Sequence, residues 1–452
     1  MKIYNTLTKS IEDLIPRVEN KINLFVCGPT VYDFPHLGHA KTYTQFDFIA
    51  RYLRWRGYEV FYLQNITDID DKIIQRASER GISWEELARE FEKIFIEDMK
   101  SLHNTSVDHF ARATDHIDHI VSQIHTLMEN GYAYEISDGF YFEISKFSEY
   151  GKLSGRIDLQ ENDAVSRIDE SEEKRGWNDF CLWKKHQSGE PFWNTSLGAG
   201  RPGWHIEDTA ITETFFGPQY DMHGGGVDLI FPHHEAEIAQ MESASGKKPL
   251  VKYWLHTGFI NVNTKKMSKS LGNFKTIRDA LDTFNYRVLR YFFVSSHYRS
   301  SINYNELSLE QAKGALKRID DFLFSIDMSY DDIENTRELQ ELKDKLIDYL
   351  DYDFDTPRAF AALFDFIRSQ NRKGRAGLRV FNFLREINGF LHILDFEQHE
   401  SISNEIKTLI DKRRQYRNTK LYTKADAIRS QIAEMGYELY DTEAGVKWRK
   451  IK

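Results

Sequence analysis

Short apolar runs separated by an amphipathic stretch occupy the first part of the chain, and they restrict the fold more than any other feature. The apolar run Ile22 to Val26 is followed by the amphipathic stretch Thr44 to Trp55 and then by a second apolar run, Val60 to Leu63. This alternation is typical of βαβ units, in which crossover helices join parallel strands. The sequence therefore predicts an α/β fold built on a Rossmann-type parallel sheet.

Changes of pattern along the chain predict further domains. Two aromatic runs flank Ser137-Asp138-Gly139, which indicates a β-hairpin outside the parallel sheet. From about Ser308 the apolar spacing becomes helical, and glycine and proline become rare. We therefore expect the first half of the catalytic sheet domain at 1–120, an insertion at 121–195, the second half at 196–255, a linking region at 256–307, a helical bundle at 308–400 and a small C-terminal domain at 401–452.

Composition limits where such a chain works and what it binds. The 452 residues include only two cysteines, too few for a disulfide framework, and no apolar stretch is long enough to span a membrane. We expect a cytoplasmic protein that does not enter membranes. The net charge is −10, yet the chain from Ser401 carries 12 Lys and Arg against 7 Asp and Glu. This basic end fits docking of a polyanion, although the charge alone slightly favours a solvated helical face.

Two short motifs indicate nucleotide chemistry. His36-Leu37-Gly38-His39 follows the first apolar run, where histidines and backbone N–H groups can face phosphates and Gly38 lets an adenine ring approach the backbone. Lys266-Met267-Ser268-Lys269-Ser270 places two cations beside two hydroxyl groups, as suits a loop that closes on a triphosphate. Either motif alone also occurs by chance or on a solvated loop. Their order and spacing together predict an enzyme that activates a carboxylate with ATP.

A second group of residues has the donor types of a metal site. Cys27 ends the first apolar run, and His233 and Glu237 have an i, i+4 spacing that places both on one helical face. Cys27 as a small buried residue and a surface His–Glu pair remain an alternative. Nearby, the run from His223 to Asp228 offers three glycines and a carboxylate for a nucleotide or an ammonium group, or forms a plain turn.

Several long stretches together resemble the class I aminoacyl-tRNA synthetases and, within them, the cysteinyl-tRNA synthetases. The resemblance spans nearly the whole chain. Its matching stretches are Phe25 to Asp33, Asn65 to Lys72, Gly200 to Glu207, His223 to Asp228, Phe231 to Glu235, Lys266 to Phe274, Asp353 to Pro357 and Lys447 to Arg449.

The resemblance implies a set of site residues. It implies catalytic roles for His36, His39, Lys266 and Lys269. It implies binding of ATP or the amino acid by Gly28, Thr30, Gly38, Thr67, Trp204, His223, Gly225, Asp228, Met267, Ser268 and Ser270.

The resemblance also implies one zinc ion per chain, bound by Cys27, Asp208, His233 and Glu237. The family's usual fourth ligand is a cysteine, and here that position holds Asp208. Aspartate keeps the charge and can bind zinc, but it is a harder ligand than a thiolate. Two interpretations of Asp208 therefore stay open, a zinc ligand and a carboxylate that does not coordinate.

The activity implied is that of a cysteine–tRNA ligase. It would use L-cysteine, ATP with Mg²⁺ and tRNA(Cys), and we expect it to act as a monomer. A ligase that passes cysteine to a small amine is one alternative, and a non-catalytic tRNA-binding paralogue is another. The tail favours tRNA, because its basic residues lie among Tyr416, Tyr422 and Trp448, which can stack on unpaired bases.

Overall fold

The structure of the chain is a computed structural model. It describes residues 1–156, 171–267, 274–396, 403–442 and 445–450, apart from the side chains of Lys266, Thr442, Lys447, Arg449 and Lys450. The chain forms two compact units. The first contains Met1–Ala312 and Lys345–Phe360, and the second contains Lys313–Asp344 and Ala361–Lys452. The finer domain boundaries drawn from the sequence stay predictions.

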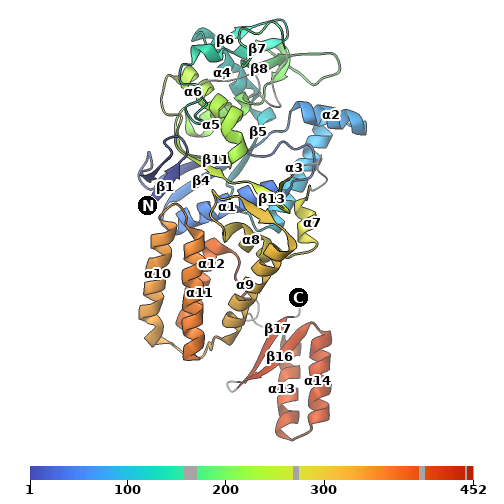
Figure 1. Cartoon of the computed structure of the whole chain (residues 1–452). Helices are drawn as coiled ribbons and strands as arrows, with labels where there is room; N and C mark the ends of the chain where they lie inside the picture. Colours follow the sequence, from blue (N-terminus) through green and yellow to red (C-terminus); the bar gives the residue numbers. More distant parts are fainter. Residues whose placement is uncertain (157–170, 268–273, 397–402, 443–444, 451–452) are drawn as a thin grey trace. The chain divides into compact units, whose positions relative to one another are not determined.

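A five-stranded parallel sheet forms the centre of the first unit, which confirms the predicted fold class (Figure 1). The strands lie in the order β12-β11-β3-β4-β5, so the first of them in the chain, β3, lies in the middle. The direction of winding changes between β3 and β11, and in such sheets ligands bind at this switch point, beyond the carboxyl ends of the strands. The five strands are β3 (Lys21–Val26), β4 (Glu59–Ile66), β5 (His109–Arg112), β11 (Tyr220–Gly226) and β12 (Val251–Thr257).

Helices complete the α/β part of this unit. The first crossover helix, α1 (Leu37–Trp55), buries most of its length, and the side chain of His36 caps its N-terminus. The remaining helices are α2 (Asp71–Arg80), α3 (Trp84–Ser101), α4 (Ile117–Glu129), α5 (Ile206–Phe216), α6 (Glu235–Ser245), α7 (Ile277–Leu281) and α8 (Tyr286–Val294).

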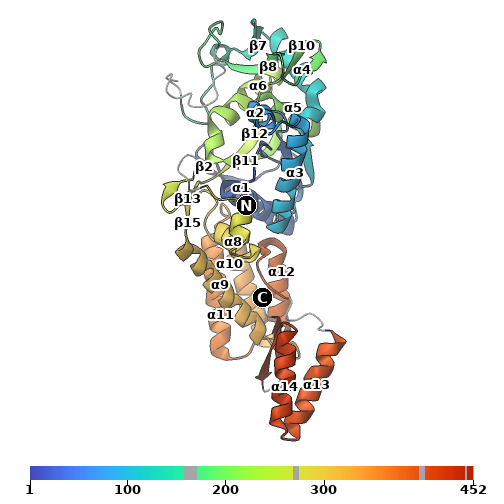
Figure 2. The ribbon, with the colours of Figure 1, turned by 90° about the vertical axis from the view of Figure 1, so that its right-hand side faces the viewer.

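The predicted hairpin is present in an antiparallel sheet of five strands, ordered β6-β7-β8-β10-β9. This sheet lies at one end of the first unit, and the parallel sheet lies between it and α1 (Figures 1 and 2). One apolar core joins the two sheets, since Phe25 and Leu63 of the parallel sheet belong to the same cluster as Phe142 and Leu182. The strands are β6 (Ala133–Glu135), β7 (Gly139–Phe142), β8 (Phe180–Lys185), β9 (Trp193–Thr195) and β10 (Gly198–Pro202).

Two small sheets complete the first unit. One pairs β1 (Lys2–Asn5) with β2 (Ser10–Asp13). The other joins β13 (Ile260–Val262) to β14 (Lys265–Lys266) and β15 (Ile302–Tyr304). The second of these sheets carries the chain from β12 into the lysine motif.

Helices dominate the chain from Glu306, as predicted. They are α9 (Glu306–Ser325), α10 (Thr336–Leu350), α11 (Thr356–Lys373) and α12 (Leu378–Leu391). The chain ends with α13 (Asn404–Asn418) and α14 (Tyr422–Glu434), which pack side by side, and a hairpin of β16 (Tyr437–Thr442) and β17 (Gly445–Lys450) (Figure 2). This C-terminal part has its own small core, which includes Ile406, Ile432 and Leu439. No helix within the described ranges is long and apolar enough to cross a membrane.

Candidate active site

A cavity of about 720 Å³ opens at the carboxyl edge of the parallel sheet. Its walls come from the segments that follow β3, β4, β11 and β12, from the N-terminus of α1, and from the insertion, which contributes Tyr150 and Trp177 among others. This is the place where the strand order predicts a ligand. We call the part formed by His36, Gly38, His39 and residues 257–260 the nucleotide end. The part formed by Cys27, Asp208 and His233 is the thiol end.

The two histidines of the first motif are organised by the start of α1. His36 Nδ1 accepts hydrogen bonds from the backbone N–H groups of Gly38 (3.0 Å) and His39 (3.4 Å), and the two imidazole rings stack with centroids 3.9 Å apart. Burial and the neighbouring His36 hold the pKa of His39 well below its usual value, so His39 is neutral at pH 7. The positive end of the helix dipole lies at this point and favours an anion.

Gly38 leaves the start of α1 open toward the cavity. A Cβ atom there would lie 2.8 Å from the ring of His36, so a larger residue would displace the histidine. The side chain of Met267 comes within 3.8 Å of the same point. The first motif and the start of the second therefore meet in one place.

The lysine motif can be followed only in part. Ser268, Lys269 and Ser270 lie outside the described residues, as does the side chain of Lys266. Met267 and Phe274, on either side of the gap, both line the cavity. The Phe274 ring packs edge-on against His36 with centroids 5.4 Å apart, and Leu37 N donates to Lys275 O at 3.1 Å. The chain thus enters and leaves the motif beside the N-terminus of α1.

The other predicted binding residues fall into two groups. Gly28, Thr30, Thr67, Trp204 and Asp228 line the cavity. His223 and Gly225 are buried in β11 and do not line the cavity. A Cβ atom on Gly225 would meet the ring of His234 at 2.8 Å, so this glycine makes room for a histidine.

The predicted metal ligands come together at the thiol end. One donor atom from each of Cys27, Asp208, His233 and Glu237 lies within 4.8 Å of every other, and all four residues are buried. His233 Nε2 is 3.0 Å from Asp208 Oδ2 and 3.0 Å from Glu237 Oε1. Cys27 Sγ is 3.8 Å from Glu237 Oε1.

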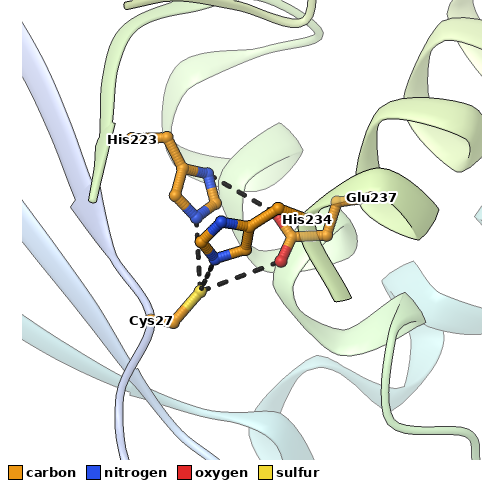
Figure 3. A group of neighbouring side chains, drawn as sticks. All are labelled: Cys27, His223, His234 and Glu237. Carbon is orange, nitrogen blue, oxygen red and sulfur yellow. Dashed lines mark hydrogen bonds and ion pairs between the residues drawn. The ribbon is translucent and has the colours of Figure 1, made fainter. Parts of the chain in front are cut away.

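A second set of donors overlaps with the first and uses Cys27 and Glu237 again (Figure 3). Cys27 Sγ is 3.2 Å from His223 Nε2 and 3.1 Å from His234 Nε2. His223 Nδ1 is 3.4 Å from Glu237 Oε2. Sequence reasoning missed His234 as a donor, although its position next to His233 was a visible signal.

A divalent cation would stabilise the charged forms of these buried acids. Burial, followed by the nearby Asp208, raises the pKa of Glu237, and burial with Glu237 and Asp208 raises the pKa of the Cys27 thiol. Asp208 Oδ1 is buried and has no hydrogen-bond partner among the described residues. Thiolate, imidazole and carboxylate are all ligands of zinc. The residues present therefore fit a metal ion.

Further histidines and an aromatic ring hold the donors in place. His233 Nδ1 is 2.8 Å from His205 Nδ1, and the ring of Trp204 stacks on His233 at 4.2 Å. His234 Nδ1 is 2.8 Å from His256 Nε2. Such outer contacts fix the orientation of a ligand histidine. His205 and His256 were not predicted: His205 lies in the matching stretch Gly200 to Glu207 but was given no role, and no local pattern marks His256.

A buried acid that the sequence did not single out lies next to Asp208. Thr67 Oγ1 donates to Glu207 Oε1 at 2.6 Å, and burial together with Asp208 raises the pKa of Glu207. Thr67, one of the predicted binding residues, is thereby fixed at the edge of the cavity.

Comparison with known proteins gives the family. Residues 14–314 match the model described as "tRNA synthetases class I (C) catalytic domain". The chain is 44% identical to the cysteine–tRNA ligase of Thermoplasma acidophilum over 99% of this chain and 100% of that protein. It is 42% identical to the cysteine–tRNA ligase of Thermococcus gammatolerans over 100% of this chain and 99% of that protein.

Solved structures agree at the level of the fold. The methionyl-tRNA synthetase of Mycobacterium tuberculosis with methionyl-adenylate superposes with a TM-score of 0.59 at 16% identity, over 82% of this chain and 88% of that one. The LeuRS in a ternary complex with tRNA from Agrobacterium radiobacter superposes with a TM-score of 0.61 at 11% identity. The match covers 84% of this chain and 85% of that one. Since the family model covers more than half of the chain and the relatives match it from end to end, the chain belongs to the class I aminoacyl-tRNA synthetases, in the cysteine–tRNA ligase family.

Proposed function

We propose that this chain activates L-cysteine with ATP and transfers it, through cysteinyl-adenylate, to the 3′-terminal adenosine of tRNA(Cys). It would do so in the cytoplasm and as a monomer. One observation carries the proposal: a single cavity joins the N-terminus of α1, with its two histidines, to a buried group of thiol, imidazole and carboxylate donors. The first part suits phosphates and the second suits a thiol.

At the nucleotide end, the cysteine carboxylate attacks the α-phosphate of ATP, which is supplied with Mg²⁺, and pyrophosphate leaves. His36 and His39 are placed to stabilise the pentacoordinate phosphate, helped by the dipole of α1. Lys266 and Lys269 then close on the departing pyrophosphate. No protein nucleophile is needed, because positioning and electrostatic stabilisation are enough for this step.

At the thiol end, Cys27, His233, Glu237 and Asp208 would hold a zinc ion, and His223 and His234 are the alternative donors. The chemistry that zinc would supply is selective binding of the substrate's thiolate over the hydroxyl of serine. Asp228 is placed to pair with the substrate ammonium, and Thr67 and Trp204 border the same space. These residues orient cysteine so that its carboxylate faces the nucleotide end.

The C-terminal helices would bind the tRNA. Lys412, Lys420 and Lys424 are exposed there, and Tyr422 has 57% of its surface exposed in the turn that starts α14. Lys424 Nζ lies over the ring of Tyr416 at 5.7 Å. Cations interleaved with aromatic rings suit an unpaired polynucleotide.

The deciding experiment is cysteine-dependent exchange of pyrophosphate into ATP, with serine as the control, on protein whose zinc has been quantified. Exchange with cysteine alone, at about one zinc per chain, is the expected result. Aminoacylation of tRNA(Cys) and of a small amine would then separate the proposed ligase from an amine ligase. Lack of exchange in zinc-replete protein would contradict the proposal in favour of a non-catalytic tRNA-binding protein.

A further inference from the structure

One backbone carbonyl group, that of Tyr298, accepts hydrogen bonds from two residues that line the cavity. Tyr298 O accepts a hydrogen bond from Gly258 N at 2.9 Å and another from Lys41 Nζ at 3.1 Å. Gly258 and Lys41 both line the cavity, one after β12 and the other on α1. Two walls of the nucleotide end therefore share a single acceptor.

Gly258 packs directly against the neighbouring backbone, so this wall cannot move independently of it. A Cβ atom on it would lie 2.5 Å from Arg299 O and 2.6 Å from Ser300 O, so its backbone lies directly on the segment that follows Tyr298. A shift of that segment would move the wall with it.

Lys41 depends on the same contact. It is 1% exposed, and its Nζ donates to two neutral acceptors, Tyr298 O and Gln45 Oε1 (3.0 Å). Burial lowers the pKa of Lys41 to about 7. With no carboxylate contact among the described residues, the position of this side chain follows that of the two acceptors.

Asp353 fixes Tyr298 at its other end. Tyr298 Oη donates to Asp353 Oδ1 at 2.8 Å, and the same oxygen accepts from Tyr4 N at 2.9 Å. Arg299 Nε donates to Asp353 Oδ2 at 2.8 Å. Burial alone would raise the pKa of Asp353, but hydrogen bonds, including those from His297 and Tyr4, and the charge of Arg299 hold it below its usual value. The carboxylate is therefore ionised, and both of its oxygens accept hydrogen bonds.

The backbone at Asp353 adopts an unfavourable conformation. Asp353 and Phe354 have φ of 56° and 53°, in the left-handed region that is unfavourable for a residue other than glycine. Asp353 N donates to Lys2 O at 2.8 Å, which helps to hold this turn. Strained backbone of this kind persists where the surroundings over-determine it and tends to occur at functional sites.

We propose that Asp353 and Tyr298 are positioning residues for the nucleotide. Through the Tyr298 carbonyl they set the places of Lys41 and Gly258, and so the shape of the nucleotide end. The proposal rests on the proposed function, in which ATP occupies that end. The thiol end has its own support in His205, which contacts His233, so we expect a loss at Tyr298 to affect ATP and not cysteine.

The test is Tyr298→Phe, which removes one hydroxyl group, compared with Tyr52→Phe. Tyr52 Oη donates to Asp351 Oδ1 at 2.7 Å, so the control loses the same kind of bond to the same segment but one that leads to no cavity residue. The Kd of ATP is measured by titration calorimetry, and the KM values of ATP and cysteine by pyrophosphate exchange. Thermal unfolding of each variant is recorded alongside.

We expect Tyr298→Phe to raise the Kd and KM of ATP about five- to tenfold, as the loss of one buried hydrogen bond allows, and to leave the KM of cysteine within about twofold. Tyr52→Phe should leave all three values within about twofold. Equal ATP affinity in Tyr298→Phe and wild type would overturn the proposal, and so would equal losses in both variants.

Asp353→Asn provides a second test if Tyr298→Phe unfolds. We expect it to show the same selective loss of ATP affinity. An unchanged ATP affinity in Asp353→Asn would also overturn the positioning role.

The Kd of ATP separates the test of this proposal from the test of the reaction itself. Wild-type protein that binds ATP but shows no cysteine-dependent exchange contradicts the proposed function alone, while the comparison of ATP affinities still decides the role of Tyr298. Wild-type protein that does not bind ATP overturns both.

Discussion

We expect Asp208 to influence how strongly the thiol end holds a metal ion. Its carboxylate contacts His233 Nε2 through Oδ2, while Oδ1 has no partner in the described part of the chain. A bound cation would satisfy this oxygen. A thiolate is a softer donor and binds zinc more tightly than a carboxylate.

We therefore predict that Asp208→Ala lowers zinc affinity at least about tenfold and that Asp208→Cys raises it, as softer donors favour zinc. Competition with a chromogenic chelator measures both. An unchanged affinity in Asp208→Ala would assign the metal to Cys27, His223, His234 and Glu237. Substitution of Cys27, which belongs to both sets, should abolish binding in either case.

The buried Lys41 should make the free energy of unfolding depend on pH. Its pKa is about 7 in the folded chain against an ordinary value of 10.5, so between these values the unfolded chain binds more protons. Stability therefore rises as the pH rises from about 7 toward 10.5. Below pH 7 the buried charge costs its full penalty, of about 5 kcal/mol at about 1.4 kcal/mol per pKa unit.

Lys41→Met should remove this penalty at the cost of leaving Gln45 Oε1 without its donor. We expect the variant to be about 2–4 kcal/mol more stable than wild type at pH 6.5, because about 1–3 kcal/mol of the gain is lost with the hydrogen bonds. The difference should shrink or reverse by pH 10. Urea unfolding at both pH values checks this, and a difference that does not change with pH would show that Lys41 is not the titrating group.

At the scale of elements, a buried ion pair fastens α8 to α1. Arg290 of α8 is fully buried and donates to Asp47 of α1, and also to Asn104 Oδ1 at 2.8 Å. Asp47 also accepts from the backbone N–H groups of Thr105 and Ser106, both at 2.9 Å. Burial would raise the pKa of Asp47, but Arg290 and Arg51 outweigh it and hold the value at about 2.

Arg290→Met should leave the Asp47 charge buried with a weaker counter-charge and cost about 3–5 kcal/mol. Asp47→Asn in the same chain should recover part of the loss, because no unpaired charge then remains. Arg337→Met, which breaks an exposed pair with Glu341, is the control and should cost less than about 1 kcal/mol. Denaturant unfolding measures all three, and a loss at Arg290 no larger than that of the control would refute the fastening role.

How much the sequence predicted depends on the distance along the chain between partners. The strands β3 and β4 and the helix α1 were found from local periodicity, and the family resemblance brought Cys27 and Glu237 together. Contacts such as Lys41 with Tyr298 or His256 with Thr6 join residues about 250 positions apart. No local pattern marks either partner, since the fold alone brings them together.

At the scale of the whole molecule, charge is distributed unevenly along the chain. The net charge is −10, yet the part from Ser401 has 12 Lys and Arg against 7 Asp and Glu. Lys412 of α13 and Lys420 before α14 are both exposed. Affinity for a polyanion falls with salt in proportion to the phosphates that such residues neutralise.

Reversing both charges, with Lys412→Glu and Lys420→Glu in one chain, should therefore leave cysteine-dependent pyrophosphate exchange unchanged and raise the KM for tRNA(Cys) about tenfold or more. The salt dependence of tRNA binding should become shallower as well. Lys412→Arg with Lys420→Arg keeps the charge and should behave like wild type. If exchange and aminoacylation fell together, the C-terminal helices would be a structural support of the catalytic unit and not its tRNA-binding part.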